Sequence, residues 1–145
     1  MASKTIAQFL RKLDRMREGV IQEAEYALVD RTYKIHAKAA RRSPLDTGKL
    51  RQSIQARISP DRRSGFVTAG NISDNSRNYA AFVEFGTGTK VSVPKGFEAM
   101  AIRFKGTKRI IGMRAQPYLI PSYLQEREHL LNDIRRIIRN EVGRP

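Results

Sequence analysis

The side chains that could perform chemistry in this sequence are few, and their spacing supports little of it. Asp46 is followed by Thr47 and Gly48, and two such carboxylates brought together in a dimer could share a proton and activate water. His36 and His129 lie far apart, and neither has a second histidine or a carboxylate at a repeated metal-ligand spacing. The chain has no cysteine, which excludes thiol nucleophiles and cysteine-based zinc sites. We therefore expect no metal and no cofactor.

The segment from Leu45 to Gly48 resembles the water-activating motif of aspartic proteases, and residues 110–112 resemble a later element of their retroviral type. That fold is almost all β, whereas Asp46 follows a long helical pattern and lies two residues after Pro44. A turn explains the same residues, because Asp accepts hydrogen bonds from nearby amides and Gly adopts positive φ. We expect a protein that is not an enzyme; a dimeric protease, inactivated by Asp46→Asn, is the alternative.

Glu84 is an acidic residue in an apolar setting, with Val83 and Phe85 on either side. A partly buried carboxylate requires a partner. One hypothesis is a salt bridge within the subunit. The other is a pairing with Arg51 or another arginine across a subunit boundary.

Positive charge dominates the composition. The chain has 145 residues, with 28 Lys and Arg against 14 Asp and Glu, a formal net charge of +14. Within residues 101–115 every charged residue is basic: Arg103, Lys105, Lys108, Arg109 and Arg114. Aromatic residues of the kind that stack on single strands do not alternate with them, and no DNA-reading module is visible. The pattern predicts an acidic partner, or phosphates contacted without base reading; a solvated loop is the alternative.

Hydrophobic periodicity predicts two helices, because apolar residues recur every three or four positions over about 5–40 and again over about 122–142. Thr5 and Ser122 are the expected N-caps, the latter with Gln125 in a capping box. The first helix would be about 50 Å long, which exceeds what one core of this size needs. Part of its apolar stripe is therefore expected to be covered by neighbouring subunits.

The region of about residues 50–115 is expected to hold a small antiparallel sheet. A hairpin over 54–59 and 65–70 and a second, basic-tipped hairpin over 100–104 and 109–113 flank a short buried helix or strand at 79–85. The fold class is α+β, with the long N-terminal helix and the C-terminal helix packed on this sheet in a single domain, 1–145. No apolar run approaches the roughly 20 residues of a membrane span, so no membrane contact is expected.

Three spaced segments of the sequence read SPLDTGKLRQSI at 43–54, YAAFVEFGTG at 79–88 and QPYLIP at 116–121. Together and in this order they resemble the tail-component family of tailed bacteriophages, the small neck proteins that join capsid to tail. The resemblance covers nearly the whole chain and departs from the family in the basic insert at 89–115 and in Gln116-Pro117-Tyr118-Leu119.

This resemblance implies a structural virion protein, made in the host cytoplasm, that forms a homo-oligomeric ring between the head connector and the tail. Its partners would be copies of itself, head-completion and tail-completion or tail-tube proteins, and genomic DNA in the lumen. A tail-terminator ring that caps the tail tube is one alternative, and a sequence-independent nucleic-acid-binding protein is another.

Two sets of residues are expected to serve this role. The ring interface is assigned to Tyr79, Phe82, Val83, Glu84, Phe85 and Thr87, together with Phe9, Leu13 and Met16 of the first helix. The DNA lumen or an acidic partner is assigned to Arg103, Lys105, Lys108, Arg109 and Arg114.

Overall fold

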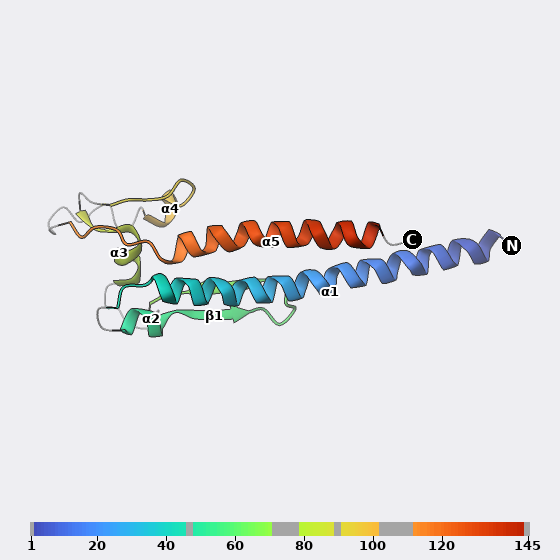
Figure 1. Ribbon diagram of the computed structural model, residues 1–145, viewed down its shortest axis with the longest axis horizontal. Coiled ribbons are helices and arrows are strands. Elements are labelled where there is room, and N and C mark those ends of the chain that lie inside the picture. Colours follow the sequence, from blue (N-terminus) through green and yellow to red (C-terminus); the bar gives the residue numbers. More distant parts are fainter. Residues whose placement is uncertain (1, 46–47, 71–78, 89–90, 102–111, 144–145) are drawn as a thin grey trace.

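The chain forms two long antiparallel helices joined by a hairpin and three short helices. The computed structural model describes residues 2–45, 48–70, 79–88, 91–101 and 112–143. Its elements are α1 (Ala2–Arg42), α2 (Lys49–Ser53), β1 (Gln55–Ile58), β2 (Gly65–Thr68), α3 (Tyr79–Phe85), α4 (Glu98–Ala101) and α5 (Leu119–Val142). The helix α1 is central and contacts both α5 and the hairpin (Figure 1). The predicted α+β class is confirmed.

The helix α1 spans 41 residues and continues through Gly19 without interruption. It begins at Ala2, so the prediction of Thr5 as its N-cap is wrong: no helix breaker precedes Thr5. It ends at Arg42, as Ser43 and Pro44 predicted, because proline disfavours helical geometry in the residue before it. The Ser43 hydroxyl donates to the Ala40 carbonyl (2.8 Å) and satisfies one of the last free acceptors.

The first predicted hairpin is confirmed. The strands β1 and β2 pair antiparallel, with Ala56 opposite Val67 and Arg57 opposite Phe66. Ala56 and Val67 are half-buried, whereas Arg57 and Phe66 are exposed, so one face of the ribbon packs on the protein. The approach to α1 is close at Gly65, where a Cβ would lie 2.0 Å from Thr32 Oγ1. Only glycine allows this packing.

The second predicted hairpin is wrong at its start and otherwise lies outside the described residues. Met100 and Ala101 belong to the helix α4, while residues 102–111 are not among those described. The first turn of α4 is favoured by Glu98, whose Oε2 accepts from the Gly96 amide (2.8 Å). In the part of the chain that the structure covers, the sheet therefore has two strands.

The helix α5 begins at Leu119, so the prediction that Ser122 is its N-cap is wrong. Pro121 is tolerated in the first turn, where a backbone N–H is not needed. Ser122 lies inside the helix, and its hydroxyl donates to the Tyr118 carbonyl (2.6 Å). The end of α5 at Val142, before Gly143, agrees with the prediction.

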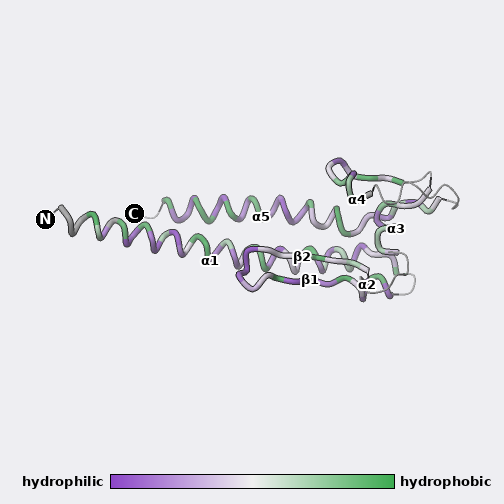
Figure 2. Tube along the Cα trace, turned by 180° about the vertical axis from the view of Figure 1, so that it is seen from behind, coloured by the Kyte–Doolittle hydropathy of each residue, from purple (hydrophilic) through white to green (hydrophobic). Residues whose placement is uncertain are grey.

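The buried core joins all three sequence segments that carry the family resemblance. It consists of Ala39, Leu50, Ile54, Ala80, Val83 and Tyr118. Leu50 and Ile54 come from the first segment, Ala80 and Val83 from the second, and Tyr118 from the third. The core lies at the end of the molecule where α1 ends and α5 begins, and apolar residues also recur on α1 beyond the end of α5 (Figure 2).

Candidate functional site

The carboxylate of Glu84 is the N-terminal cap of α5. Its Oε2 accepts from the backbone amides of Tyr118 and Leu119, and its Oε1 accepts from that of Ile120, each at 2.9 Å. The next residue, Pro121, has no N–H, so this one side chain satisfies the free donors of the first turn. A negative charge here also complements the positive end of the helix dipole.

This position tests one of the two hypotheses for Glu84, the salt bridge within the subunit. Glu84 is 5% exposed, and among the described residues its carboxylate is bonded to backbone amides and not to an arginine. The expected intramolecular salt bridge is therefore wrong. Arg51 instead donates to the Ala40 carbonyl (2.8 Å) at the end of α1.

Further hydrogen bonds join the end of α3 and the residues after it to the segment before α5. The Thr87 amide donates to the Met113 carbonyl (2.9 Å), and the Met113 amide donates to Thr87 Oγ1 (2.8 Å). The Gln116 amide donates to the Val83 carbonyl (2.8 Å). Tyr118 is 1% exposed; burial first, and then the nearby Glu84 carboxylate, raise its pKa. The second and third sequence segments therefore form one buried junction.

Charged side chains fasten α1 to α5. Arg31 Nη1 lies 2.9 Å from Glu126 Oε2, and Arg31 Nη2 lies 2.7 Å from Asp133 Oδ2. Lys38 pairs with the other oxygen of Glu126, a residue that is 1% exposed. Burial acts to raise the Glu126 pKa, but the hydrogen bonds and charges of Lys38 and Arg31 together outweigh it and lower that pKa.

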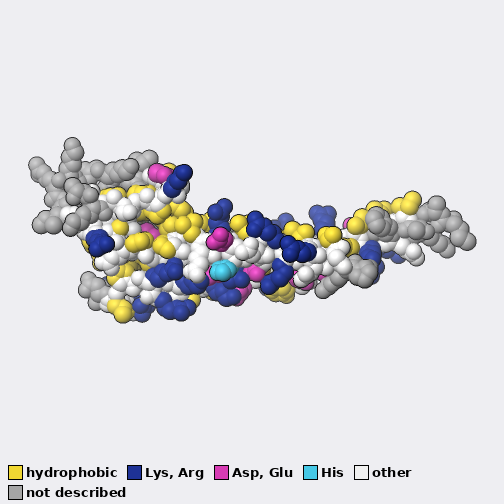
Figure 3. Space-filling model, turned by 45° about the horizontal axis from the view of Figure 1, so that its top comes forward, with side chains coloured by type: hydrophobic (Ala, Val, Ile, Leu, Met, Phe, Trp, Pro, Cys, Tyr) yellow, Lys and Arg dark blue, Asp and Glu magenta, His cyan; other side chains and the backbone are white. Residues whose placement is uncertain are grey.

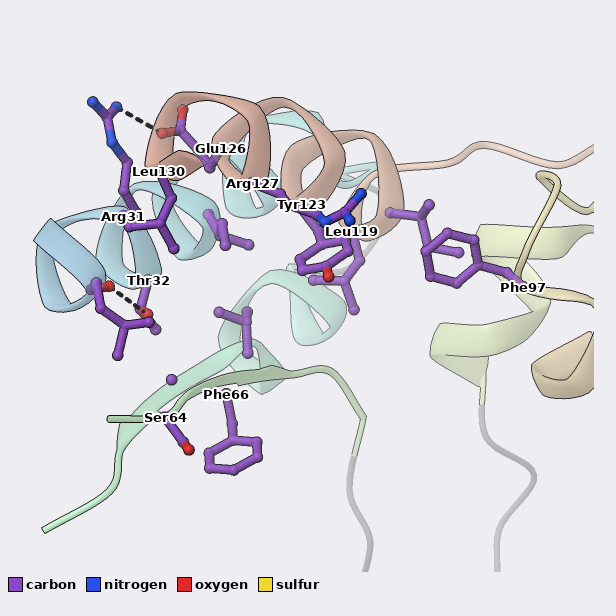
Figure 4. A pocket seen from close by; sticks show the side chains of 15 residues that line it. Arg31, Thr32, Ser64, Phe66, Phe97, Leu119, Tyr123, Glu126, Arg127 and Leu130 are labelled. Atoms are coloured by element: carbon purple, nitrogen blue, oxygen red, sulfur yellow. Dashed lines mark hydrogen bonds and ion pairs between the residues drawn. The ribbon is translucent and has the colours of Figure 1, made fainter. Parts of the chain in front are cut away.

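An apolar groove of about 580 Å³ lies over α1, between β2 and α5. Tyr123, Leu119 and Leu130 line it from α5, and Phe97 closes one end, its ring packed edge to face against Tyr123 with centroids 6.4 Å apart (Figure 4). Phe66 lies on the side of β2 away from α5 (Figure 4). Tyr123 is 41% exposed. The groove is suited to a row of apolar side chains.

The N-terminal part of α1 carries a second exposed apolar surface. Ile6, Leu10 and Leu13 are 59%, 53% and 44% exposed, and Met16 is half-buried. Figure 3 shows hydrophobic side chains on this projecting end and again where α5 begins. A stripe with this spacing is the face that a helix normally buries.

The structure separates the predicted interface residues into two groups. Val83, Glu84, Phe85 and Thr87 are buried inside the subunit, Phe82 is half-buried and Tyr79 is 51% exposed. Phe9, Leu13 and Met16 lie on α1, at the opposite end of the molecule. Their role in a ring stays a prediction.

The predicted lumen residues fall mostly outside the described part of the chain. Arg103, Lys105, Lys108 and Arg109 are not among the described residues, and neither is Asp46. Arg114 is exposed, in the irregular segment before α5. Among the described residues no group of potential metal ligands is present, and no helix has the length and hydrophobicity to cross a bilayer.

Sequence reasoning missed the groove and the Glu126 ion pairs. No sequence pattern predicts the groove, because its lining residues come from four separate parts of the chain: α1, β2, the segment before α4, and α5. The ion pairs did leave a pattern: Arg31 and Lys38 are spaced by a heptad, as are Glu126 and Asp133, and residues spaced by seven share a helix face.

Comparison with known families gives a match that covers most of α1, the hairpin and α3. The sequence model described as "Bacteriophage HK97-gp10, putative tail-component" matches residues 7–86, which is more than half of the chain. The match runs from Ala7, in the second turn of α1, through Gly86 and includes Glu84. No curated protein and no solved structure matches the chain.

Proposed function

Because the chain belongs to the HK97-gp10-like family of phage tail components, we propose that it forms an oligomeric ring in the neck of a tailed phage, joining head connector to tail. The family match over residues 7–86 carries this proposal. A tail component is a structural protein of the virion that contacts other virion proteins. The ring, its station in the neck and the passage of DNA through it are the parts we propose.

Exposed apolar surface supports self-assembly. The subunit leaves Ile6, Leu10 and Leu13 about half exposed on α1, and it leaves Tyr123 exposed in the groove. Large apolar surfaces of this kind mark interaction sites on folded proteins. Closed rings are formed when the same head-to-tail contact repeats around an axis.

Net charge supports a lumen that holds DNA. A formal charge of +14 per subunit gives a ring a strong positive field, and the backbone of DNA is attracted to such a field without any reading of bases. We assign this contact to Lys105, Lys108 and Arg109 of the basic insert. The alternative, a sequence-independent nucleic-acid-binding protein, would bind duplex DNA tightly as a monomer or dimer, with an affinity that falls steeply as salt rises.

The neck role is tested in the phage that encodes the chain. Deletion of its gene is expected to yield filled heads and separate tails, and supply of the chain with a C-terminal tag is expected to restore whole particles with the tag at the head–tail junction. A tag along the tail tube or at the tail tip would contradict the neck station. A tag already present on unjoined tails would place the ring on the tail as a terminator.

The lumen contact is tested by removing charge. The triple variant Lys105→Gln/Lys108→Gln/Arg109→Gln should bind duplex DNA more weakly, with a smaller fall in affinity as salt rises. A matched control removes the same charge from exposed positions elsewhere, with Arg41→Gln/Arg135→Gln/Arg139→Gln. Equal losses in both variants would show a diffuse charge effect and contradict the assignment.

A further inference from the structure

The register of the two long helices leaves one end of α1 without a partner. Arg42 donates to Ser122 Oγ (3.1 Å), and Arg31 pairs with Asp133. This antiparallel register places Val142, the last residue of α5, opposite about residue 22 of α1 at equal rise per residue. The segment 6–20, called the arm below, therefore projects past α5 by roughly 20 to 30 Å (Figure 1).

The apolar stripe of the arm continues the face that α1 turns toward α5. Leu13 lies 18 residues before Arg31, which is about five helical turns, and Leu10 lies 21 residues before it, which is nearly six; Arg31 points at α5. Within the subunit this face loses its cover where α5 ends, so Ile6, Leu10 and Leu13 stay exposed. Removal of such leucines from water is favourable, so the arm is built to be covered.

The groove at the other end of the molecule is long enough to hold the apolar row of the arm. Its wall on α5 runs from Leu119 to Leu130, which is about 17 Å of helix. The arm residues Ile6, Leu10 and Leu13 cover about 10 Å along their helix. A helix laid in a groove is recognised through apolar anchors with this spacing.

Acidic residues of the arm can pair with a basic residue beside the groove. Asp14 and Glu18 are exposed on the arm, one turn apart, among four basic residues that leave the arm a net charge of +2, and Arg127 is exposed on the rim of the groove. In the part of the chain that is described, none of the three forms an ion pair within the subunit. In a chain of net charge +14, two acidic residues on the docking helix offset repulsion between copies.

We propose that the arm of one subunit docks in the groove between β2 and α5 of a second copy of this chain. This inference rests on the proposed self-assembly and names the surfaces that perform it. The arm and the groove lie at opposite ends of one rigid helix, so a subunit cannot fill its own groove. The contact is head-to-tail, the kind of contact that forms a ring when its rotation closes around an axis.

Disulfide trapping tests the contact directly, because the natural chain has no cysteine. Chains with Leu13→Cys in the arm and chains with Tyr123→Cys in the groove, distinguished by a mass tag, are mixed and mildly oxidised. The expected product is the mixed arm–groove dimer. Arg15→Cys, two residues after Leu13 and therefore on about the opposite face of the arm, is the matched control and should give no mixed dimer.

Two results would overturn the proposal. Arm–arm dimers without mixed dimers would show that two arms pair with each other, and no cross-linked pair at high protein concentration would show that the arm does not dock on a copy. If the mixed dimer forms but the tagged chain lies away from the neck in virions, docking is supported and the neck function is rejected. If the tagged chain lies at the neck but no mixed dimer forms, docking alone is rejected.

Complementation gives a second readout that does not need cysteine. Leu10→Gln/Leu13→Gln disables the arm, and Tyr123→Gln/Leu130→Gln disables the groove; each should raise the concentration needed for assembly by about 100-fold. A mixture of the two retains one intact junction and should yield dimers and nothing larger. Dimers formed by the groove variant alone would contradict the head-to-tail contact. Circular dichroism melting shows that both variants are folded.

Discussion

Replacement of Glu84 by glutamine tests whether this side chain builds the subunit or a subunit boundary. The carboxylate accepts three backbone N–H bonds at 2.9 Å in a site that is 5% exposed. An amide has a single oxygen, so even in its better orientation its NH₂ group faces one of the donors that the carboxylate satisfied. The change therefore leaves one buried donor without a partner and removes a negative charge from a helix N-terminus.

The expected cost of Glu84→Gln follows from these two losses. An unsatisfied buried donor costs about 1 to 3 kcal/mol, and the charge at the helix terminus contributes about 0.3 to 1 kcal/mol. The free energy of unfolding should fall by about 3 kcal/mol in total. Glu84→Ala would leave all three donors without a partner and is more disruptive.

Urea denaturation followed by circular dichroism measures this cost, at protein concentrations low enough to keep the chain monomeric. Glu128→Gln, an exposed glutamate of α5, is the control and should change stability by less than about 0.5 kcal/mol. A Glu84→Gln variant with the midpoint of the natural chain as a monomer, but with lost assembly, would refute the capping role and restore the boundary hypothesis.

Three further changes test the packing of α1. Glu126→Gln should lower stability by about 3 kcal/mol at neutral pH, because it removes the buried charge that two half-buried cations share. Since the folded pKa of Glu126 lies below the ordinary 4.5, its contribution is complete above that pH and is lost as pH falls through the folded value, so acid titration of both chains should show their stabilities converge. Gly65→Ala should cost about 1 to 3 kcal/mol in a thermal melt, because its Cβ would meet Thr32 Oγ1, and Thr32→Ala in the same chain should recover part of that loss; a loss of the same size with and without Thr32 would contradict the close approach. The raised pKa of Tyr118 means that its contribution is complete below pH 10.0 and lost as pH rises further, so Tyr118→Phe should resist alkaline unfolding better than the natural chain; equal alkaline midpoints would contradict this.

Local sequence patterns predicted the elements that local chemistry determines. The apolar period of α1, its end before Pro44 and the turn-bounded hairpin at β1 and β2 all follow from residues close in the chain. The excess length of α1 was also visible, because a helix longer than its core can cover must leave apolar residues exposed. The exposed Ile6 and Leu10 agree with that expectation.

Long-range contacts determined what the patterns missed. Ser122 and Gln125 match the pattern of a capping box, yet α5 begins at Leu119. The cap is Glu84, which lies 36 residues before Ile120 and accepts from its amide. A local pattern cannot anticipate such a cap. The groove likewise follows from the antiparallel register of α1 and α5 and from the close approach of Gly65 to α1. Neither the Glu84 cap nor the groove can be read from a pattern of neighbouring residues, because each joins residues that are far apart in the sequence.

Imaging of the head–tail junction by electron cryomicroscopy tests the neck assignment most directly. The account predicts a closed ring of this chain around the axis, between the head connector and the tail, with the end of each α1 resting in the groove beside α5 of the next copy. Virions that contain the chain elsewhere than at this junction, or that lack it, would contradict the account.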